Sequence, residues 1–192
     1  MYLFFDTETT GFPARWDAPC ADTDNWPRLV QIAWARWSTN GQCVDQQVHI
    51  VRPLGFSIPK DAERVHGIST AQALLEGSSL REVLDLFSVA LDESDVIVAH
   101  NIAFDECVVT AEFAREGRRL DLGGKTKIDT MKASTEYCRL PGRSGYKYPT
   151  LAELYFCLFR RQLEDTHRAD ADVRACVECF FELQRRGVIG TA

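Results

Sequence analysis

The stretch MYLFFDTETTGF, residues 1–12, runs five largely apolar residues straight into Asp6, and Glu8 follows two places later. Residues 2–6 are predicted to form a buried strand, in which side chains at i and i+2 point to the same side. Asp6 and Glu8 therefore face the same way. Acids at a strand end are often simply solvated. If these two are instead held together, their mutual repulsion requires a cation.

The composition is that of an ordinary globular protein. The 192 residues are 45% hydrophobic and 26% charged, which suits a single domain spanning residues 1–192. Residues 1–5 lack the basic lead and the length of a signal peptide, and no apolar run approaches the ~18 residues needed to cross a bilayer. We therefore expect a cytoplasmic protein with no membrane partner.

Seven cysteines are scattered along the chain, and without an export signal we expect them to be reduced thiols. Cys176 and Cys179 form a CxxC, but they lie in a helical pattern and no second pair accompanies them. Two packed helix cysteines are therefore favoured over a zinc site.

The net charge of −6 argues at first sight against a nucleic-acid partner. Segment 114–147, however, holds nine Lys or Arg and four acids, so it carries +5 and the remainder of the chain carries −11. A locally basic segment could bind a polyanion. An ordinary solvated surface is the alternative, and the charge pattern alone does not separate the two.

The hydrophobic pattern predicts an antiparallel start followed by alternating strands and helices. Residues 29–38 alternate in hydrophobicity, and Asn40-Gly41 is the dipeptide favoured in hairpin turns. Residues 10–28 are predicted to form a long loop. We expect an α/β fold with a mixed central sheet, antiparallel in its first three strands and then parallel, flanked by helices. The other predicted elements are strands 43–52, 95–100 and 127–129, and helices 58–68, 69 onward, 79–91, 104–117, 130–139, 150–160 and 169–186.

A third acid follows the buried strand that ends in HNIAFD, residues 100–105. Asp105 lies in the first turn of the next helix, where the helix dipole favours an acid. That position has a purely structural explanation, yet strand ends are also where α/β sheets place their sites.

A fourth acid and a histidine come from HRADAD, residues 167–172. On one helix His167 and Asp172 would not share a face. They can reach one site if His167 lies in the loop before the helix and Asp172 lies one turn inside it. Helical periodicity starting near Ala169 agrees with this. Asp170 is the competing acid, and its spacing suits the site less well.

These segments supply four carboxylates and one histidine. Hard oxygen ligands of this kind select Mg²⁺ or Mn²⁺ rather than zinc. Two such ions ~4 Å apart can stabilise the attacking and leaving oxygens of a phosphoryl displacement. A histidine with a pKa near neutrality can take the proton from the attacking water.

FDTETTG, HNxxFD and HxAxxD, in this order, resemble the three motifs of the DnaQ-like, DEDDh family of 3′–5′ exonucleases. RLVQIA at 28–33 and VHGI at 65–68 also resemble that family. The resemblance implies a ribonuclease H-like fold and hydrolysis of single-stranded DNA or RNA 3′ ends, with release of nucleoside 5′-monophosphates. The alternatives are a binding module of the same fold that grips nucleic-acid ends or associates with a polymerase without cutting, and a phosphatase of small phosphates.

The same resemblance implies a role for each matched residue. Asp6 would bridge two Mg²⁺ or Mn²⁺ ions. Glu8 and Asp172 would hold the ion that orders the nucleophilic water, and Asp105 would support the second ion. His167 would be the general base.

Substrate contacts are implied beside the first motif. Thr9 and the backbone near Gly11 would contact the terminal 3′ nucleotide, and Phe12 would pack against the terminal bases. Asn101 and His100 match family positions near the site, with hydrogen bonding at the strand end as the alternative.

Two regions depart from the simpler members of the family. Trp16 and Trp26 lie in the long loop, where one of them could stack on a base, although packing of the loop onto the domain is favoured. The basic, aromatic segment 139–149 is predicted to contact the phosphate backbone through Lys147 or Arg143. A free-standing nuclease is favoured, and a polymerase partner is possible but not indicated. The sequence leaves DNA versus RNA, oligomeric state and physiological pathway open.

Overall fold

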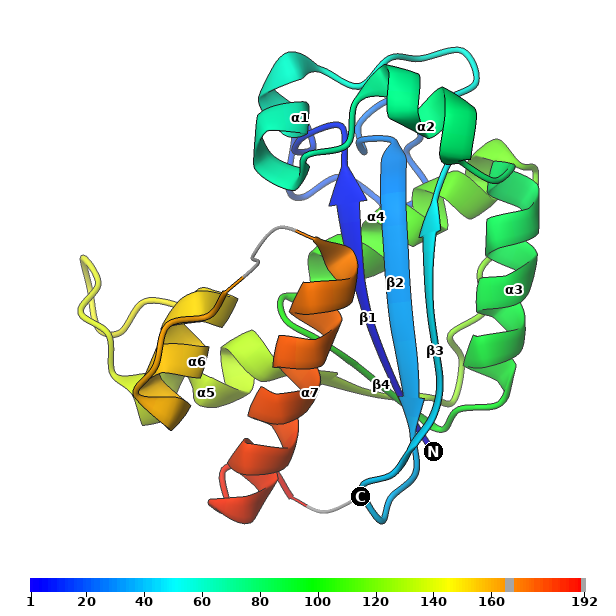
Figure 1. Ribbon diagram of the computed structural model, residues 1–192. Coiled ribbons are helices and arrows are strands. Elements are labelled where there is room, and N and C mark those ends of the chain that lie inside the picture. The colour runs from blue at the N-terminus through cyan, green and yellow to red at the C-terminus, as the bar shows by residue number, and fades with distance from the viewer. Residues whose placement is uncertain (165–167, 191–192) are drawn as a thin grey trace.

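The computed structural model describes residues 1–164 and 168–190, and its core is a five-stranded mixed sheet (Figure 1). The strands are β1 (Tyr2–Thr9), β2 (Leu29–Trp37), β3 (Cys43–Ile50), β4 (Val96–Ala99) and β5 (Thr126–Asp129). Their order is β3-β2-β1-β4-β5, which places β1 at the centre. β1, β2 and β3 pair antiparallel, and β1, β4 and β5 pair parallel. The predicted α/β class and mixed sheet are confirmed.

Helices cover both faces of the sheet (Figure 1). The side chains of α3 and α4 pack on one face, and those of α6 and α7 pack on the other. Among the described helices, none is both long enough and apolar enough to cross a membrane. The helices are α1 (Lys60–His66), α2 (Thr70–Glu76), α3 (Leu80–Asp92), α4 (Ile102–Arg115), α5 (Thr130–Cys138), α6 (Leu151–Phe159) and α7 (Ala169–Arg185).

The central strand is buried on both faces, and its alternation decides where the acids point. Leu3 and Phe5 pack with α3 and α4, whereas Tyr2 and Phe4 pack with α6 and α7. Side chains two residues apart share a face of a strand. Continuing the alternation from Tyr2 and Phe4 therefore puts Asp6 and Glu8 on the face covered by α7.

β1 continues to Thr9, three residues past the predicted end, because β2 pairs with it along this length. Asp6 lies opposite Ala33 and Glu8 opposite Gln31. Both acids therefore lie within the paired part of β1 and not after its end. The hydrogen bonds of the strand fix the directions of their side chains.

The start of α4 differs from the prediction by two residues, because the chain turns sharply after β4. Asn101 takes a left-handed conformation with φ 72°, and α4 begins at the next residue. Asparagine tolerates this conformation better than most residues. The tight turn brings Asp105 close to the carboxyl end of the sheet.

Three predicted helix starts are confirmed by their side-chain caps. Ser69 accepts a hydrogen bond from the Gln72 N–H, and Ser79 accepts one from the Glu82 N–H. Thr150 forms a complete capping box with Glu153 at the start of α6. Such caps satisfy N–H groups that a helix cannot pair internally.

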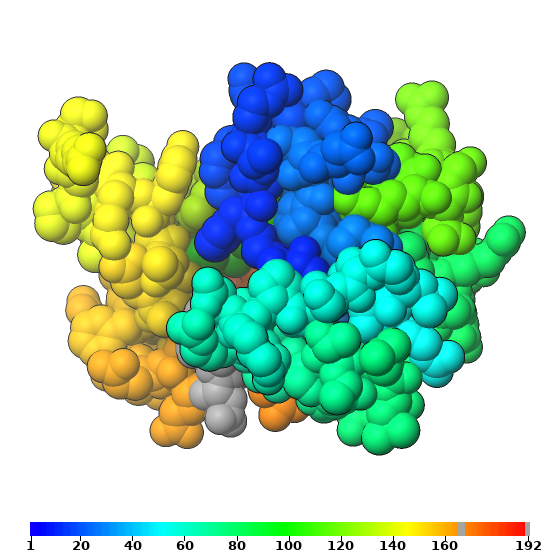
Figure 2. Space-filling view, turned by 90° about the horizontal axis from the view of Figure 1, so that it is seen from above, coloured from blue at the N-terminus to red at the C-terminus, as the bar shows by residue number. Residues whose placement is uncertain are grey.

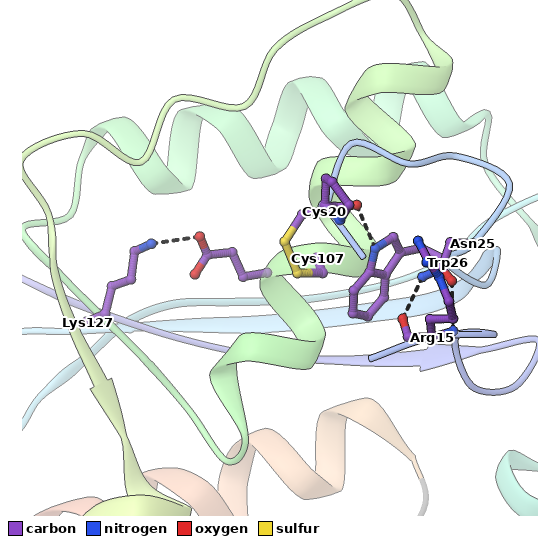
Figure 3. The surroundings of a disulfide bond; sticks show 8 residues. Arg15, Cys20, Asn25, Trp26, Cys107 and Lys127 are labelled. Carbon is purple, nitrogen blue, oxygen red and sulfur yellow. Dashed lines mark hydrogen bonds and ion pairs between the residues drawn. A yellow bond between two sulfur atoms is a disulfide. The ribbon is translucent and has the colours of Figure 1, made fainter. Parts of the chain in front are cut away.

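The loop between β1 and β2 packs onto α4. The buried Trp26 side chain, 4% exposed, donates its Nε1–H to the Pro19 carbonyl at 3.0 Å. A disulfide joins Cys20 of the loop to Cys107 of α4, with the two Cα atoms 4.3 Å apart (Figure 3). The expectation that every cysteine is a reduced thiol is therefore wrong for this pair, because the path of the loop brings together two side chains 87 residues apart.

The end of the loop is fixed by a buried acid of α4. Glu112 is fully buried and accepts hydrogen bonds from Arg28 Nε at 2.9 Å and from the Leu29 N–H at 2.8 Å. Arg115 lies 3.0 Å from the same carboxylate oxygen. Removing one partner of a buried charge pair is strongly destabilising, so this network ties the start of β2 to α4.

Reducing the Cys20–Cys107 disulfide is expected to lower the free energy of unfolding by about 2–4 kcal/mol, because it frees a long loop in the unfolded chain. Urea denaturation with and without a phosphine reductant measures this loss, and Cys20→Ser should reproduce it. Cys43→Ser, at an exposed free thiol, is the matched control. Thiol titration of the unfolded, unreduced protein should find five free cysteines, and seven would contradict the bond.

Candidate active site

Three carboxylates meet where β1 and α7 cross. Asp6 and Glu8 point toward α7, and Asp172 lies in the first turn of that helix. One oxygen from each residue can be chosen so that all three lie within 4.8 Å of one another. Segments 164 residues apart in the sequence (172 − 8) thus supply one cluster.

The position of α7 is set by a residue on the neighbouring strand. Gln31 lies opposite Glu8 on β2, and its buried side-chain oxygen accepts the Ala169 N–H at 3.1 Å. This N–H belongs to the first turn of α7 and has no partner within the helix. The bond fixes the start of α7 beside β1, which brings Asp172 to the cluster.

The competing acid of this helix has other partners. Asp170 lies 3.3 Å from Arg168 and 3.0 Å from Arg174. Asp172, and not Asp170, joins Asp6 and Glu8, in agreement with the ranking made from the sequence. His167 lies outside the described residues.

Asp105 approaches from the other side of β1. It is buried, and one of its oxygens accepts the Thr7 N–H at 3.0 Å and the Thr7 hydroxyl at 2.7 Å. Thr7 points away from Asp6 and Glu8, toward α4, because strand side chains alternate. Asp105 is therefore held next to the cluster without being one of its three members among the described residues.

Burial and mutual repulsion make these acids hard to ionise. Burial, followed by the charges of Asp105, Asp172 and Glu8, raises the pKa of Asp6 well above its usual value. Burial, followed by the charges of Asp172 and Asp105, raises the pKa of Glu8 to about 8. Burial raises the pKa of Asp105 to about 7, although the hydrogen bonds from Thr7 oppose that rise. A bound cation would reverse this penalty by stabilising the ionised forms.

A cavity of about 510 Å³ opens on the Glu8 side of the cluster. It is lined by β1 and the turn that follows, by α1 and by Phe104 of α4, and it includes all three residues predicted to meet the terminal nucleotide: Thr9, Gly11 and Phe12. The Thr9 hydroxyl donates to the Gly11 carbonyl at 2.6 Å, which shapes the turn. Phe12 projects from that turn and is 79% exposed.

A second cavity of about 270 Å³ opens on the Asp6 side, and Asp172 and His100 also line it. His100 Nε2 donates to the Pro149 carbonyl at 2.9 Å, and Nδ1 pairs with the Thr130 hydroxyl at 3.0 Å. Burial lowers the pKa of His100. Nε2 therefore joins the end of β4 to the segment before α6, and Nδ1 joins it to the start of α5.

Two other residues expected to bind the substrate, Asn101 and Lys147, lie in other surroundings. The Asn101 N–H donates to the Asp129 carboxylate at 3.0 Å, and its side chain does not cap α4. Lys147 is exposed and pairs with Glu153, the capping-box acid of α6, at 2.5 Å. Neither residue lines the two cavities beside the carboxylates.

Seen from above, the molecule is hollowed between two sides (Figure 2). The blue segment after β1 and the cyan α1 region lie on one side, and the yellow-to-orange α5–α6 region lies on the other. The basic segment 139–149 belongs to the second side. The hollow lies above the end of the sheet where the two cavities open.

The amino-acid sequence also matches a known protein family. The family model described as Exonuclease (RNase_T) matches residues 3–180. The chain belongs to the exonuclease family. The resemblance to DnaQ-like 3′–5′ exonucleases, carried by the three motifs, is thereby confirmed.

Two relatives align with most of this exonuclease-family chain. It is 28% identical over 185 residues to the PolC-type DNA polymerase III of Lacticaseibacillus paracasei, which covers 96% of this chain and 11% of the relative. It is 29% identical over 179 residues to the DNA polymerase III subunit epsilon of Treponema pallidum, covering 93% of this chain and 74% of that subunit. The chain thus spans about a tenth of the length of its PolC-type relatives.

Solved exonuclease structures share the fold. E. coli Exonuclease I in complex with a dT13 oligonucleotide matches 96% of this chain and 41% of its own, with a TM-score of 0.77 and 18% identity. The same enzyme in complex with a dA16 oligonucleotide matches with a TM-score of 0.74 and 17% identity, over 96% of this chain and 40% of its own. At these identities the likeness supports the ribonuclease H-like fold.

Three residues of this exonuclease site were not found by sequence reasoning. Thr7 holds Asp105, Gln31 holds the start of α7, and Phe104 lines the larger cavity. All three lie inside quoted motifs, FDTETTG, RLVQIA and HNxxFD, so a signal was present. Their contacts depend on tertiary packing and could not be read from spacing.

Proposed function

We propose that this chain is a metal-dependent 3′–5′ exonuclease that releases nucleoside 5′-monophosphates from single-stranded 3′ ends. The observation that carries the proposal is the cluster of Asp6, Glu8 and Asp172 between two open cavities. Membership of the exonuclease family supports it. Exonuclease I, whose fold this chain shares, was crystallised with single-stranded oligonucleotides, which favours the same substrate class here.

The donor set fits hard divalent cations. Three clustered carboxylates offer only oxygen atoms, and their raised pKa values reflect burial and repulsion that positive charge would relieve. Mg²⁺ or Mn²⁺, when bound, would neutralise charge on the reacting phosphate and favour ionisation of the attacking water. Asp6 would hold both of two ions, and Glu8 and Asp172 would hold one of them. Asp105 would support the second from its place on Thr7.

Proton transfer is assigned to His167, two residues before α7 begins. A histidine titrates near neutral pH and can accept the proton that the water loses. The nearby His100 is a poor alternative, because both of its ring nitrogens are hydrogen-bonded and burial lowers its pKa.

The terminal nucleotide is assigned to the cavity of about 510 Å³ on the Glu8 side, a volume within the range of small-molecule sites. Thr9 and Gly11 would contact the sugar and phosphate, and Phe12 would pack against the base. Lys147 remains a proposed contact for the phosphate backbone, and Asn101 remains a proposed contact for the substrate. The phosphodiester would then lie at the cluster of Asp6, Glu8 and Asp172.

The proposal is tested by time-resolved digestion of matched DNA and RNA oligonucleotides labelled at the 5′ end. We expect a ladder shortened from the 3′ end in Mg²⁺ or Mn²⁺, no ladder in EDTA, and release of 5′-monophosphates. His167→Ala should slow release by ~10²–10⁴-fold, the usual contribution of a general base. His49→Ala is the matched control, because His49 pairs with Gln47 on the edge strand β3.

Two outcomes would contradict the proposal. Robust digestion in EDTA would exclude a metal-dependent mechanism. Tight binding of 3′ ends without turnover in either metal would identify a binding module of the same fold.

A further inference from the structure

Three aromatic rings form a cluster at the mouth of the larger cavity. Phe12 and Trp16 come from the long loop, and Phe104 comes from α4. Their ring centroids are 6.1 Å apart for Phe12–Trp16, 5.9 Å for Trp16–Phe104 and 6.3 Å for Phe12–Phe104. Trp16 nevertheless remains 61% exposed. The loop thus presents a large ring to solvent while fixing it against two others.

The backbone beside Trp16 is held by a pair of hydrogen bonds from one side chain. The Asn25 side chain accepts the Arg15 N–H at 2.8 Å and donates to the Arg15 carbonyl at 2.9 Å (Figure 3). The Ala14 N–H also donates to the Asn25 carbonyl at 3.1 Å. The residues just before Trp16 are therefore tied to the returning arm of the loop.

The returning arm is itself fixed to the domain. Trp26 is buried and its ring centroid lies 6.3 Å from that of Phe104. The Cys20–Cys107 disulfide joins the loop to α4 two residues past Asp105 (Figure 3). The exposed ring is therefore pre-organised, and a ligand that stacks on it would lose little free energy in ordering the loop.

The three rings lie next to the cavity that contains Glu8. Phe12 and Phe104 line the cavity that contains Glu8, whereas Trp16 touches these two rings and lies outside that lining. Phe104 directly precedes Asp105. If the terminal nucleotide of a strand fills the cavity, the base of the nucleotide before it would lie at Trp16.

We propose that Trp16 is a substrate-positioning residue that stacks on the base next to the 3′-terminal nucleotide. The inference rests on the proposed function and deepens it by naming single strands of at least two nucleotides as the favoured substrate. Every base has an aromatic face, so stacking of this kind tolerates sequence and selects unpaired strands. In a duplex the same faces are covered by neighbouring pairs.

The test compares Trp16→Ala with wild type on oligonucleotides of increasing length and on a mononucleotide ester. Removal of one stacking ring is expected to raise KM roughly tenfold for single-stranded oligonucleotides, with kcat retained. The loss in kcat/KM should grow from the ester to the dinucleotide. Trp16→Phe should restore much of it, and Val89→Ala, at a 56% exposed site on α3, should behave as wild type.

A binding measurement makes the result independent of turnover. Fluorescence anisotropy of a 5′-labelled oligothymidylate in EDTA should give a Kd roughly tenfold higher for Trp16→Ala than for wild type. Asn25→Ala should raise Kd in the same direction by a smaller factor, because it loosens the loop but keeps the ring.

The outcomes separate this inference from the proposed function. If wild type digests oligonucleotides and Trp16→Ala has the same KM and Kd, the stacking role is overturned and the exonuclease proposal stands. If wild type binds with Trp16-dependent Kd but digests nothing, the stacking role stands alone. If wild type neither binds nor digests oligonucleotides, both are overturned.

Discussion

Asp6→Asn is expected to reduce nucleotide release by at least ~10²–10³-fold, the loss typical of removing one charged or polar group from a pre-organised site. Asp6 lies on the central strand and belongs to the cluster with Glu8 and Asp172. An amide in its place keeps the shape but removes the negative charge that would hold the cations. Initial rates of oligonucleotide digestion in saturating Mn²⁺ measure the effect.

The same change is expected to raise the melting temperature of the metal-free protein. Burial and the charges of its neighbours hold the pKa of Asp6 well above its usual value, so its ionised form is unfavourable in the folded state. Thermal unfolding in EDTA at pH 8 should therefore show a higher melting temperature for Asp6→Asn. Asp92→Asn, at the last residue of α3, is the matched control for a loss of one negative charge.

Two results would contradict this account. If Asp6→Asn digested oligonucleotides at the wild-type rate, the cluster would not bind the catalytic cations. A lower melting temperature in EDTA would mean that the amide loses more in packing than it gains by removing charge repulsion.

The placement of three acids could be predicted from the sequence because it depends on local periodicity. Strand alternation puts Asp6 and Glu8 on one side, and the start of helical periodicity at Ala169 puts Asp172 one turn inside α7. The alternation of Tyr2 and Phe4 also selects the face that α7 covers. Local rules sufficed here since Asp6 and Glu8 continue the alternation that buries Tyr2 and Phe4 on one face of β1.

The position of Asp105 could not be predicted in the same way. Its carboxylate is set by Thr7, which lies 98 residues earlier and points to the opposite face of β1. The sequence indicates an acid in the first turn of α4, but the depth and direction of that turn depend on the left-handed Asn101. Contacts between distant segments require the packed structure.

The long loop illustrates the same limit. Trp16 and Trp26 lie in the same predicted loop, yet Trp26 is buried against the domain and Trp16 is exposed. What separates them is the path of the chain through Cys20, which meets Cys107 on α4. A loop with three prolines gives no periodicity from which that path could be derived.

The buried acids make the stability of the metal-free protein depend on pH. Each raised pKa means that the folded protein holds a proton which the unfolded chain has released. A cation that requires ionised carboxylates competes with those protons. The ionised carboxylates destabilise the metal-free protein at high pH, and the same carboxylates would bind metal at that pH. Stability is thus lower where function requires these charges.

Metal-free protein is expected to lose stability as the pH rises from about 5 to about 8. The pKa of Glu8 is raised from 4.5 to about 8, and that of Asp105 from 3.8 to about 7. Between those limits the folded state binds more protons than the unfolded state, so the free energy of unfolding falls with pH. Each such proton contributes about 1.4 kcal/mol per pH unit. Urea denaturation in EDTA at intervals across this range measures the slope.

Added Mn²⁺ or Mg²⁺ should oppose this loss, and more strongly at pH 8 than at pH 6, because binding requires the deprotonated carboxylates. The melting temperature should therefore rise with Mn²⁺ by a larger amount at the higher pH. Asp6→Asn should flatten both the pH slope and the response to Mn²⁺, whereas Asp92→Asn should keep both. An equal rise at the two pH values, or a rise that survives in Asp6→Asn, would place the stabilising cation away from the cluster of Asp6, Glu8 and Asp172.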